Sequence, residues 1–280
     1  MQLLFNTVML EINRWTEHHK ITYPLIDLLE QLKRADFTAL EIWQYHISSL
    51  SNDEIEMLKQ KMDVLGITAY VVGAYIDFHH TGKDDDAMNN LIDKLIEVAV
   101  KLNTKIFKIK PGGQPSADVD DDMWNLSVSK IKKLAKKLAN NGIMLSMETH
   151  AYSLCDTEES TIRLMKDLSD VKNVGICYQP FDAQTTKEAM ATFTEMLPHI
   201  IHIHLQNLPD SNAETTTFLE TGGWMNYTLL LPHIKNSGFD NIICLEFTEG
   251  IFPPKGKKFD PQVVINNSIK DREFFYKYFK

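Results

Sequence analysis

The stretch IMLSMETHAYSLCDTEESTIRLMKDL, residues 143–168, holds a strand, a loop and a helix in succession. The segment 143–148 is mostly apolar and ends on Glu148, as expected for a short strand that is covered on both faces. Thr157 and the acidic residues after it fit the cap and first turn of a helix that runs to Leu168. The stretch therefore predicts one complete β/α unit.

Comparable units lie on both sides of this stretch. The spacing from one strand to the next is about 27 to 39 residues, which fits one right-handed βαβ step. The predicted strands are residues 3–9, 39–43, 68–72, 105–110, 143–148, 174–178, 200–205 and 242–247. The predicted helices are residues 23–35, 53–65, 84–102, 121–140, 157–168, 185–196, 226–236 and 264–279.

Three of the predicted helices run into a glycine just before the next strand, at Gly66, Gly142 and Gly238. Glycine takes the left-handed backbone of such a junction at the lowest cost. Eight successive units favour a closed (β/α)8 TIM barrel, formed by residues 1–280 as a single domain. An open doubly wound sheet would need a glycine-rich phosphate turn after its first strand, and residues 6–15, NTVMLEINRW, contain no glycine.

The composition argues against several classes of partner. The chain has 280 residues, 38 acidic against 29 basic, and a net charge of −9, which would repel a nucleic-acid backbone. No apolar run is long enough to cross a bilayer, and no basic leader begins the chain, so a cytoplasmic location without a membrane partner is expected. The cysteines Cys155, Cys177 and Cys244 lack metal-type spacing and are expected to be buried free thiols.

Polar side chains stand at the carboxyl ends of most predicted strands. A barrel gathers these ends at one mouth, where active sites of this fold lie. In chain order they are Glu41, Lys108, Lys110, Glu148, His150, Gln179, Asp182, His202, His204 and Glu246.

Glu148, His204 and Glu246 are each embedded in an apolar strand, where an isolated charge is costly unless it is paired or bound to metal. Two carboxylates and an imidazole suit a divalent ion such as Mn²⁺, Mg²⁺, Co²⁺ or Zn²⁺. His202 shares a strand face with His204, which lies nearer the mouth and is the preferred ligand. The alternatives are carboxylates in structural ion pairs and a histidine satisfied within the core.

The second half of the chain carries the motifs METHAYSLCDTEESTIRLM, NVGICYQPFD, HIIHIHLQN, TGGWMNY and GFDNIICLEF. These motifs, in strand order, resemble the xylose isomerase-like barrels of the sugar phosphate isomerase/epimerase family. That group includes ketose 3-epimerases, inosose dehydratases, hydroxypyruvate isomerase and, more distantly, endonuclease IV. The resemblance is strongest over residues 143–247 and weaker before them.

In that family the metal is held by Glu, Asp, His and Glu on strands five to eight. The resemblance implies Glu148, His204 and Glu246 as ligands, with Gln179 standing where the family has the Asp. Gln179 is the preferred fourth ligand, and Asp182 is assigned to the substrate, although Asp182 is the alternative ligand. Where the family often has Lys and Asp after the strand-seven histidine, this chain has the amides of residues 206 and 207.

The resemblance implies an isomerase or epimerase of a small carbohydrate. Glu148 and Glu246 would exchange protons on opposite faces of a carbon beside a metal-bound hydroxy-ketone. His150 is expected to bind a substrate hydroxyl or to make a structural hydrogen bond. Lys108 and Lys110 share one strand face. They would meet an anionic substrate group, or one of them would form a structural ion pair with Glu148 or Glu41. Aromatic walls are expected from Trp43 and Trp224 in preference to Trp15, Tyr45 and Phe78.

Two other functions compete with this one. A lyase of the inosose dehydratase type would use the same metal and glutamates to expel water. A barrel that has lost its metal would act as a binding protein, an idea that the amides at Gln179 and Asn207 motivate. DNA repair in the manner of endonuclease IV would need more His and Asp ligands and a basic face. Barrels of this kind often pair, so a homo-oligomer is also an expectation.

Overall fold

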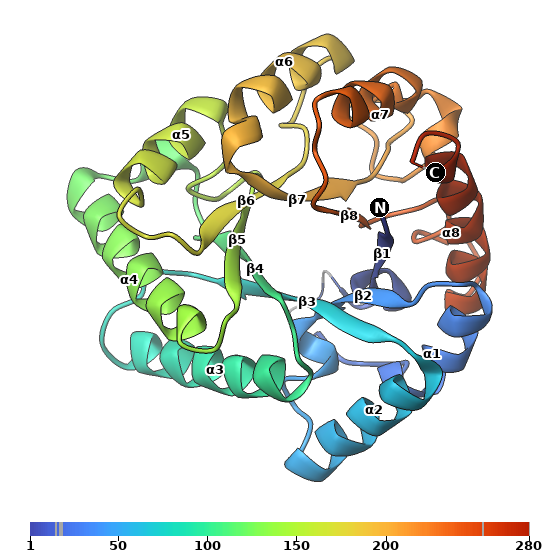
Figure 1. The fold of residues 1–280 in the computed structure, drawn as a ribbon, viewed down its shortest axis with the longest axis horizontal. Helices are drawn as coiled ribbons and strands as arrows, with labels where there is room; N and C mark the ends of the chain where they lie inside the picture. Colours follow the sequence, from blue (N-terminus) through green and yellow to red (C-terminus); the bar gives the residue numbers. More distant parts are fainter. Residues whose placement is uncertain (15, 17–18, 254, 280) are drawn as a thin grey trace.

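Eight parallel strands close into a barrel in chain order, with β1 paired to both β2 and β8 (Figure 1). The structure is a computed structural model that describes residues 1–14, 16, 19–253 and 255–279. The strands are β1 (Leu3–Asn6), β2 (Ala39–Trp43), β3 (Thr68–Ile76), β4 (Ile106–Pro111), β5 (Met144–Glu148), β6 (Val174–Tyr178), β7 (Ile200–Leu205) and β8 (Ile242–Leu245). The (β/α)8 prediction is confirmed.

An outer ring of helices covers the barrel (Figure 1). The α-helices are α1 (Leu25–Arg34), α2 (Asn52–Leu65), α3 (Gly82–Lys101), α4 (Asp121–Ala139), α5 (Glu158–Asp167), α6 (Thr186–Met196), α7 (Tyr227–Asn236) and α8 (Pro261–Tyr276). Short 3-10 turns are η1 (Thr7–Leu10), η2 (Gln44–His46), η3 (Ser116–Asp118), η4 (Leu197–His199) and η5 (Leu219–Thr221). Among the helices of the described chain, none has the length and apolarity that a bilayer crossing requires.

Three strands match their predicted bounds, and the differences elsewhere have local causes. β1 ends at Asn6 rather than residue 9, because the Asn6 side chain accepts from Val8 N and starts a 3-10 turn. β3 continues past residue 72 to Ile76, through the strand glycine Gly73. β8 ends at Leu245, so Glu246 lies immediately beyond the strand. The predicted glycine junctions at residues 66, 142 and 238 all have positive φ.

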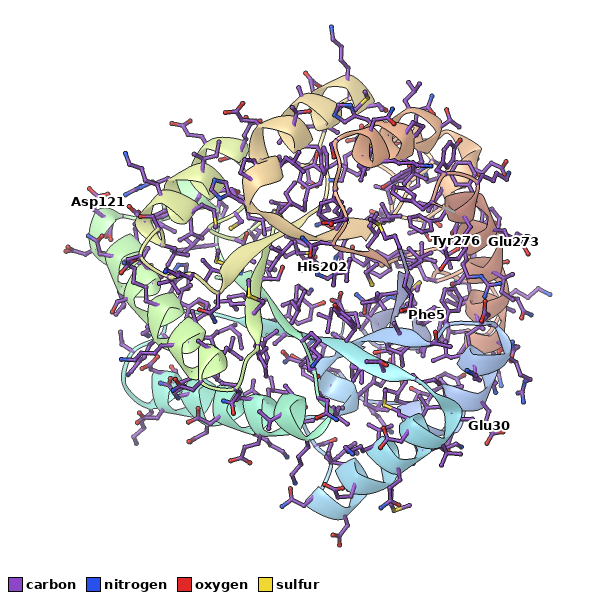
Figure 2. All side chains as sticks on the ribbon, in the orientation of Figure 1. Phe5, Glu30, Asp121, His202, Glu273 and Tyr276 are labelled. Carbon is purple, nitrogen blue, oxygen red and sulfur yellow. The ribbon has the colours of Figure 1, made fainter. Side chains whose placement is uncertain are left out.

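Two apolar cores enclose the strands. The larger fills the space between strands and helices, and the smaller forms a floor inside the barrel from Leu4, Ala39, Val71, Ile106 and Cys244. Side chains alternate along a strand, so residues two positions beyond each floor residue also point inward and lie nearer the mouth. Figure 2 shows His202 within the ring of strands, whereas Glu30, Asp121 and Glu273 project from the outer helices. The floor therefore closes one end of the barrel and leaves a polar layer above it.

Asp271 on α8 ties the last helix to the loops after β7 and β8. Its carboxylate accepts from Leu219 N at 2.8 Å and from Thr248 Oγ1 at 2.6 Å. Burial raises the pKa of Asp271 from 3.8 to about 7. The protonated form is thus favoured in the folded state, so the free energy of unfolding should fall as the pH rises from 3.8 towards 7.

The Asp271→Asn variant should lack this pH dependence. A pKa change from 3.8 to about 7 corresponds to about 4 kcal/mol as an upper bound. Urea unfolding of both proteins at pH 4 and pH 8 measures the difference. We expect the variant to gain stability relative to the wild type at pH 8. If the difference in free energy of unfolding between variant and wild type is the same at pH 4 and pH 8, the raised pKa of Asp271 is refuted.

Candidate metal centre at the barrel mouth

The polar layer above the floor brings together five ionisable side chains from five strands. Glu41, Lys108, Glu148 and His204 are each at most 3% exposed, and Glu246 is 7% exposed. Two register shifts, at Leu40/Glu41 and Ile176/Cys177, adjust how neighbouring strands are aligned at this level. All five side chains are therefore removed from bulk water. Charges interact more strongly in such a buried layer than they do in water.

Lys108 lies between two carboxylates. Its Nζ is 2.6 Å from Glu148 Oε2 and 3.4 Å from Glu41 Oε1. Burial alone would lower the pKa of Lys108, but these two carboxylates outweigh it and hold the pKa well above its usual value. Burial alone would raise the pKa of Glu148, but Lys108 and His204 hold it well below its usual range. Lys108 thus occupies the ion-pair position that was the alternative to substrate binding.

Gly73 on β3 makes room for this ion pair. It is the register partner of both Trp43 and Lys108. A Cβ at position 73 would lie 2.8 Å from Glu41 Oε1 and 3.2 Å from Lys108 Cε, which is closer than ordinary packing allows. The side chains of Glu41 and Lys108 therefore meet only because residue 73 has none.

Glu41 also fixes the orientation of His204. The Nε2 atom of His204 lies 2.9 Å from Glu41 Oε2, and that of His202 lies 3.3 Å from the same oxygen. Burial lowers the pKa of His202 to about 3, so that ring is neutral. A carboxylate accepts only, so the close contact places a proton on Nε2 of His204, and Nδ1 is the nitrogen through which this ring would bind a metal.

Three electron-pair donors converge at the Nδ1 side of His204. Nδ1 is 3.3 Å from Glu148 Oε1 and 3.4 Å from Glu246 Oε2, and one ligand atom from each residue lies within 4.8 Å of the others. His204 Nδ1 and Glu246 Oε2 are buried without a hydrogen-bond partner among the described residues. Burial alone would lower the pKa of His204, but Cys177, Glu41 and Glu246 hold it well above its usual value, so without a metal Nδ1 carries a proton on the side of the two carboxylates. A divalent cation would take the place of that proton among the same three ligand atoms. The residues therefore fit a metal ion.

Gln179 at the end of β6 is buried beside the β5 terminus. Its backbone N–H donates to Thr149 Oγ1 at 2.8 Å, and its side-chain Oε1 accepts from Gln206 Nε2 at 3.1 Å. The two glutamines thus form one neutral pair at positions where the resembling family has Asp and Lys. The neighbouring Asn207 donates to Met225 O and anchors the loop after β7.

The remaining predicted substrate residues have different surroundings. The Nδ1 atom of half-buried His150 lies 2.8 Å from Ala151 O, and Trp224 Nε1 donates to Gln184 O at 2.7 Å. Trp43 is buried, with no partner for its Nε1 among the described residues. Asp182 is not brought to the centre: it is exposed and lines a hollow on the outer surface. Trp15 lies outside the described residues.

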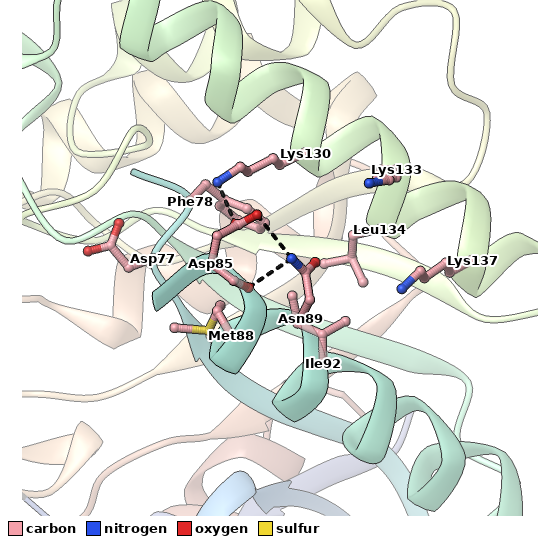
Figure 3. A pocket seen from close by; sticks show the side chains of 10 residues that line it. All are labelled: Asp77, Phe78, Asp85, Met88, Asn89, Ile92, Lys130, Lys133, Leu134 and Lys137. Atoms are coloured by element: carbon pink, nitrogen blue, oxygen red, sulfur yellow. Dashed lines mark hydrogen bonds and ion pairs between the residues drawn. The ribbon is translucent and has the colours of Figure 1, made fainter. Parts of the chain in front are cut away.

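A separate cavity between α3 and α4 is lined by Phe78, three lysines and Asp85 (Figure 3). Its volume is about 60 Å³, and the pair Lys130 Nζ–Asp85 Oδ1 at 2.6 Å crosses it. A few waters would fill this space, which is too small for a carbohydrate. Phe78 therefore belongs to this outer cavity and not to the centre in the barrel.

Residues 29–263 match the family described as xylose isomerase-like TIM barrel. The chain belongs to this family. A 3-dehydroshikimate dehydratase from Bacillus anthracis is 22% identical over 190 residues, which cover 66% of this chain and 67% of the relative. Two solved structures of the family's fold are similar along 100% of both chains: D-psicose 3-epimerase from Clostridium cellulolyticum H10 (14% identity, TM-score 0.75) and the IOLI protein with a bound zinc atom (16% identity, TM-score 0.74).

Three residues around the family's metal position have roles that the sequence did not assign. The sequence shows that Glu41 is a charged residue within the otherwise apolar strand ALEIW, but it does not indicate that Glu41 contacts His204. Gly73 and Tyr75 were not singled out at all. The sequence signal for Gly73 is a glycine in the middle of the mainly apolar strand TAYVVGAYI, which indicates a close approach by other groups.

Proposed function

We propose that this protein is a divalent-metal-dependent isomerase or epimerase of a small polyhydroxylated carbonyl compound. The observation that supports it best is the convergence of Glu148 Oε1, Glu246 Oε2 and His204 Nδ1 on one buried point. Removal of a proton from carbon beside a carbonyl needs a base and a stabilised negative oxygen in a site without bulk water. The centre offers both.

Glu148, His204 and Glu246 would hold the metal, with the amide oxygen of Gln179 as the fourth ligand. When bound, the ion would polarise the substrate carbonyl and stabilise the negative charge that develops on its oxygen. Glu41 would keep the His204 ring in the tautomer that presents Nδ1, as carboxylates beside ligating histidines commonly do.

The two glutamates have unequal surroundings that define their roles. Lys108 keeps Glu148 ionised through Oε2 and leaves Oε1 for the metal. Glu246 would bind the metal through Oε2 and is the stronger candidate for the first base through its other carboxylate oxygen. In an epimerase one glutamate takes the proton from one face of the carbon, and the other returns a proton on the opposite face.

A dehydratase is the second candidate, and the Bacillus anthracis relative favours it. The same first proton removal would be followed by loss of a neighbouring hydroxyl as water. His150 is the group that would assist this departure. Its Nδ1 contacts Ala151 O, so its Nε2 is the nitrogen left to exchange a proton with the substrate.

Mass spectrometry of products formed in D₂O separates these functions. The protein is incubated with Mn²⁺ and a panel of hydroxy-ketones, both sugars and cyclic compounds. An isomerase or epimerase yields product of unchanged formula that carries solvent deuterium, whereas a dehydratase yields product that has lost one water. Metal analysis of freshly purified protein should show a stoichiometric divalent ion, and its absence together with no turnover would favour the metal-free binding protein.

A further inference from the structure

The two lysines of β4 have different surroundings although their side chains share one face of the strand. Lys108 is buried and paired with Glu41 and Glu148. Lys110, one step nearer the mouth, is half-buried and makes no hydrogen bond or ion pair within the part of the chain that the structure describes. Burial lowers the pKa of Lys110 and the Glu148 carboxylate raises it, so the amine lies within electrostatic range of the metal centre. The Lys110 ammonium therefore has no anionic partner among the described residues.

Tyr75 on β3 is the register partner of Lys110, so the two side chains stand next to each other on the inner face. The Tyr75 ring lies 5.7 Å from Lys108 Nζ, which places it against the buried ion pair. Its hydroxyl makes no hydrogen bond with any described residue. Burial raises the pKa of Tyr75, and the three nearby glutamates also raise it, so the phenol keeps its proton and can donate it in a hydrogen bond.

Arg14 is a further buried cation. It follows η1, is 2% exposed and donates to the backbone oxygens of Glu11 and Ile251. Burial lowers its pKa to about 10, which still leaves it charged at neutral pH. Tyr75 stands beside two other cations, with Lys108 Nζ 5.7 Å from its ring and Lys110 as its register partner.

We propose that Lys110 and Tyr75 form a subsite for a carboxylate of the substrate, beside the carbonyl that the metal centre activates. One ammonium and one phenol O–H match the two oxygens of a carboxylate, whereas a phosphate would leave further oxygens without donors. The substrate class is then a polyhydroxylated keto acid rather than a neutral sugar. This inference rests on the proposed function for the position of the carbonyl.

Binding of unreactive probes tests the subsite separately from catalysis. Glycerate, glycerol and glycerol 3-phosphate differ only in the group offered to Lys110, and calorimetry on the Mn²⁺-loaded full chain measures their affinities. We expect glycerate to bind about tenfold or more tightly than glycerol, as a charge-assisted hydrogen bond allows. Lys110→Met should abolish this preference, Lys110→Arg should keep it, and Tyr75→Phe should reduce it severalfold.

Lys105→Met is the matched control, because Lys105 is exposed at the opposite end of the same strand. Its preference for glycerate should equal that of the wild type. A preference that persists in Lys110→Met, or a wild type without any preference, would overturn the subsite, and a Lys110-dependent preference for glycerol 3-phosphate would overturn its assignment to a carboxylate. Lys110-dependent binding without turnover of any hydroxy-ketone or keto acid would refute the proposed function and leave the subsite standing.

Discussion

Replacement of Lys108 by methionine should lower the free energy of unfolding by about 3 to 5 kcal/mol at neutral pH, the range seen when one partner of a buried ion pair is removed. Methionine keeps much of the volume of the lysine shank but leaves Glu41 and Glu148 buried without their cation. Urea unfolding in the presence of a chelator measures the loss without interference from bound metal.

The pH dependence of this loss gives a second readout. The pKa of Glu41 is lowered from 4.5 to about 2 in the folded protein, so its stabilisation is present above pH 4.5 and is lost as the pH falls towards 2. In Lys108→Met the carboxylates should protonate more readily, and the deficit relative to the wild type should shrink as the pH falls below 4.5. The double variant Lys108→Met with Glu148→Gln should recover part of the loss at pH 7. Equal stability of wild type and Lys108→Met at pH 7 would show that the ion pair is not needed.

Replacement of Glu246 by glutamine should abolish turnover, with a loss of about 10³-fold or more, while the fold stays intact. Glutamine preserves the shape of the side chain but removes both its negative charge and its basicity. Because Glu246 Oε2 accepts no hydrogen bond from any described residue, the change breaks none at this oxygen. Deuterium incorporation into product measures turnover, and calorimetric titration with Mn²⁺ measures the accompanying loss of metal affinity.

Gln179→Asp is the companion variant, for which we expect the opposite change in Mn²⁺ affinity. It restores a carboxylate at the fourth ligand position and should tighten Mn²⁺ binding. Its Oδ atoms can still accept from Gln206 if the shorter side chain reaches it. Full activity in Glu246→Gln would refute the assigned base, and unchanged metal affinity in both variants would place the ion elsewhere.

The sequence predicted the fold well because each β/α unit carries its own local signals. The strands over residues 39–43, 174–178 and 200–205 match their predicted bounds, since each is a short, mainly apolar run that a glutamine follows. The predicted strands run past the observed ends of β1 and β8, because the apolar run continues beyond the last ladder hydrogen bond. An apolar sequence indicates that a segment is buried, so a buried loop at these ends has the same sequence pattern as a strand.

The candidate centre was predictable only in part. Glu148, His204 and Glu246 lie at strand ends, so the barrel's topology alone brings them together. The contacts of Lys108 with two glutamates, the pairing of Tyr75 with Lys110 and the contact of Gln179 with Gln206 depend on the alignment between strands. That alignment includes two register shifts, which no spacing within a single strand reveals.

The absence of a side chain at position 73 reaches further than its own strand. The space that a side chain would fill at this point of the inner wall is occupied by the side chains of Glu41 and Lys108. An added methyl group would push the Glu41 carboxylate away and with it the acceptor that decides which ring nitrogen of His204 carries hydrogen. A residue without any functional group would in this way govern the protonation of an imidazole on the far side of the barrel.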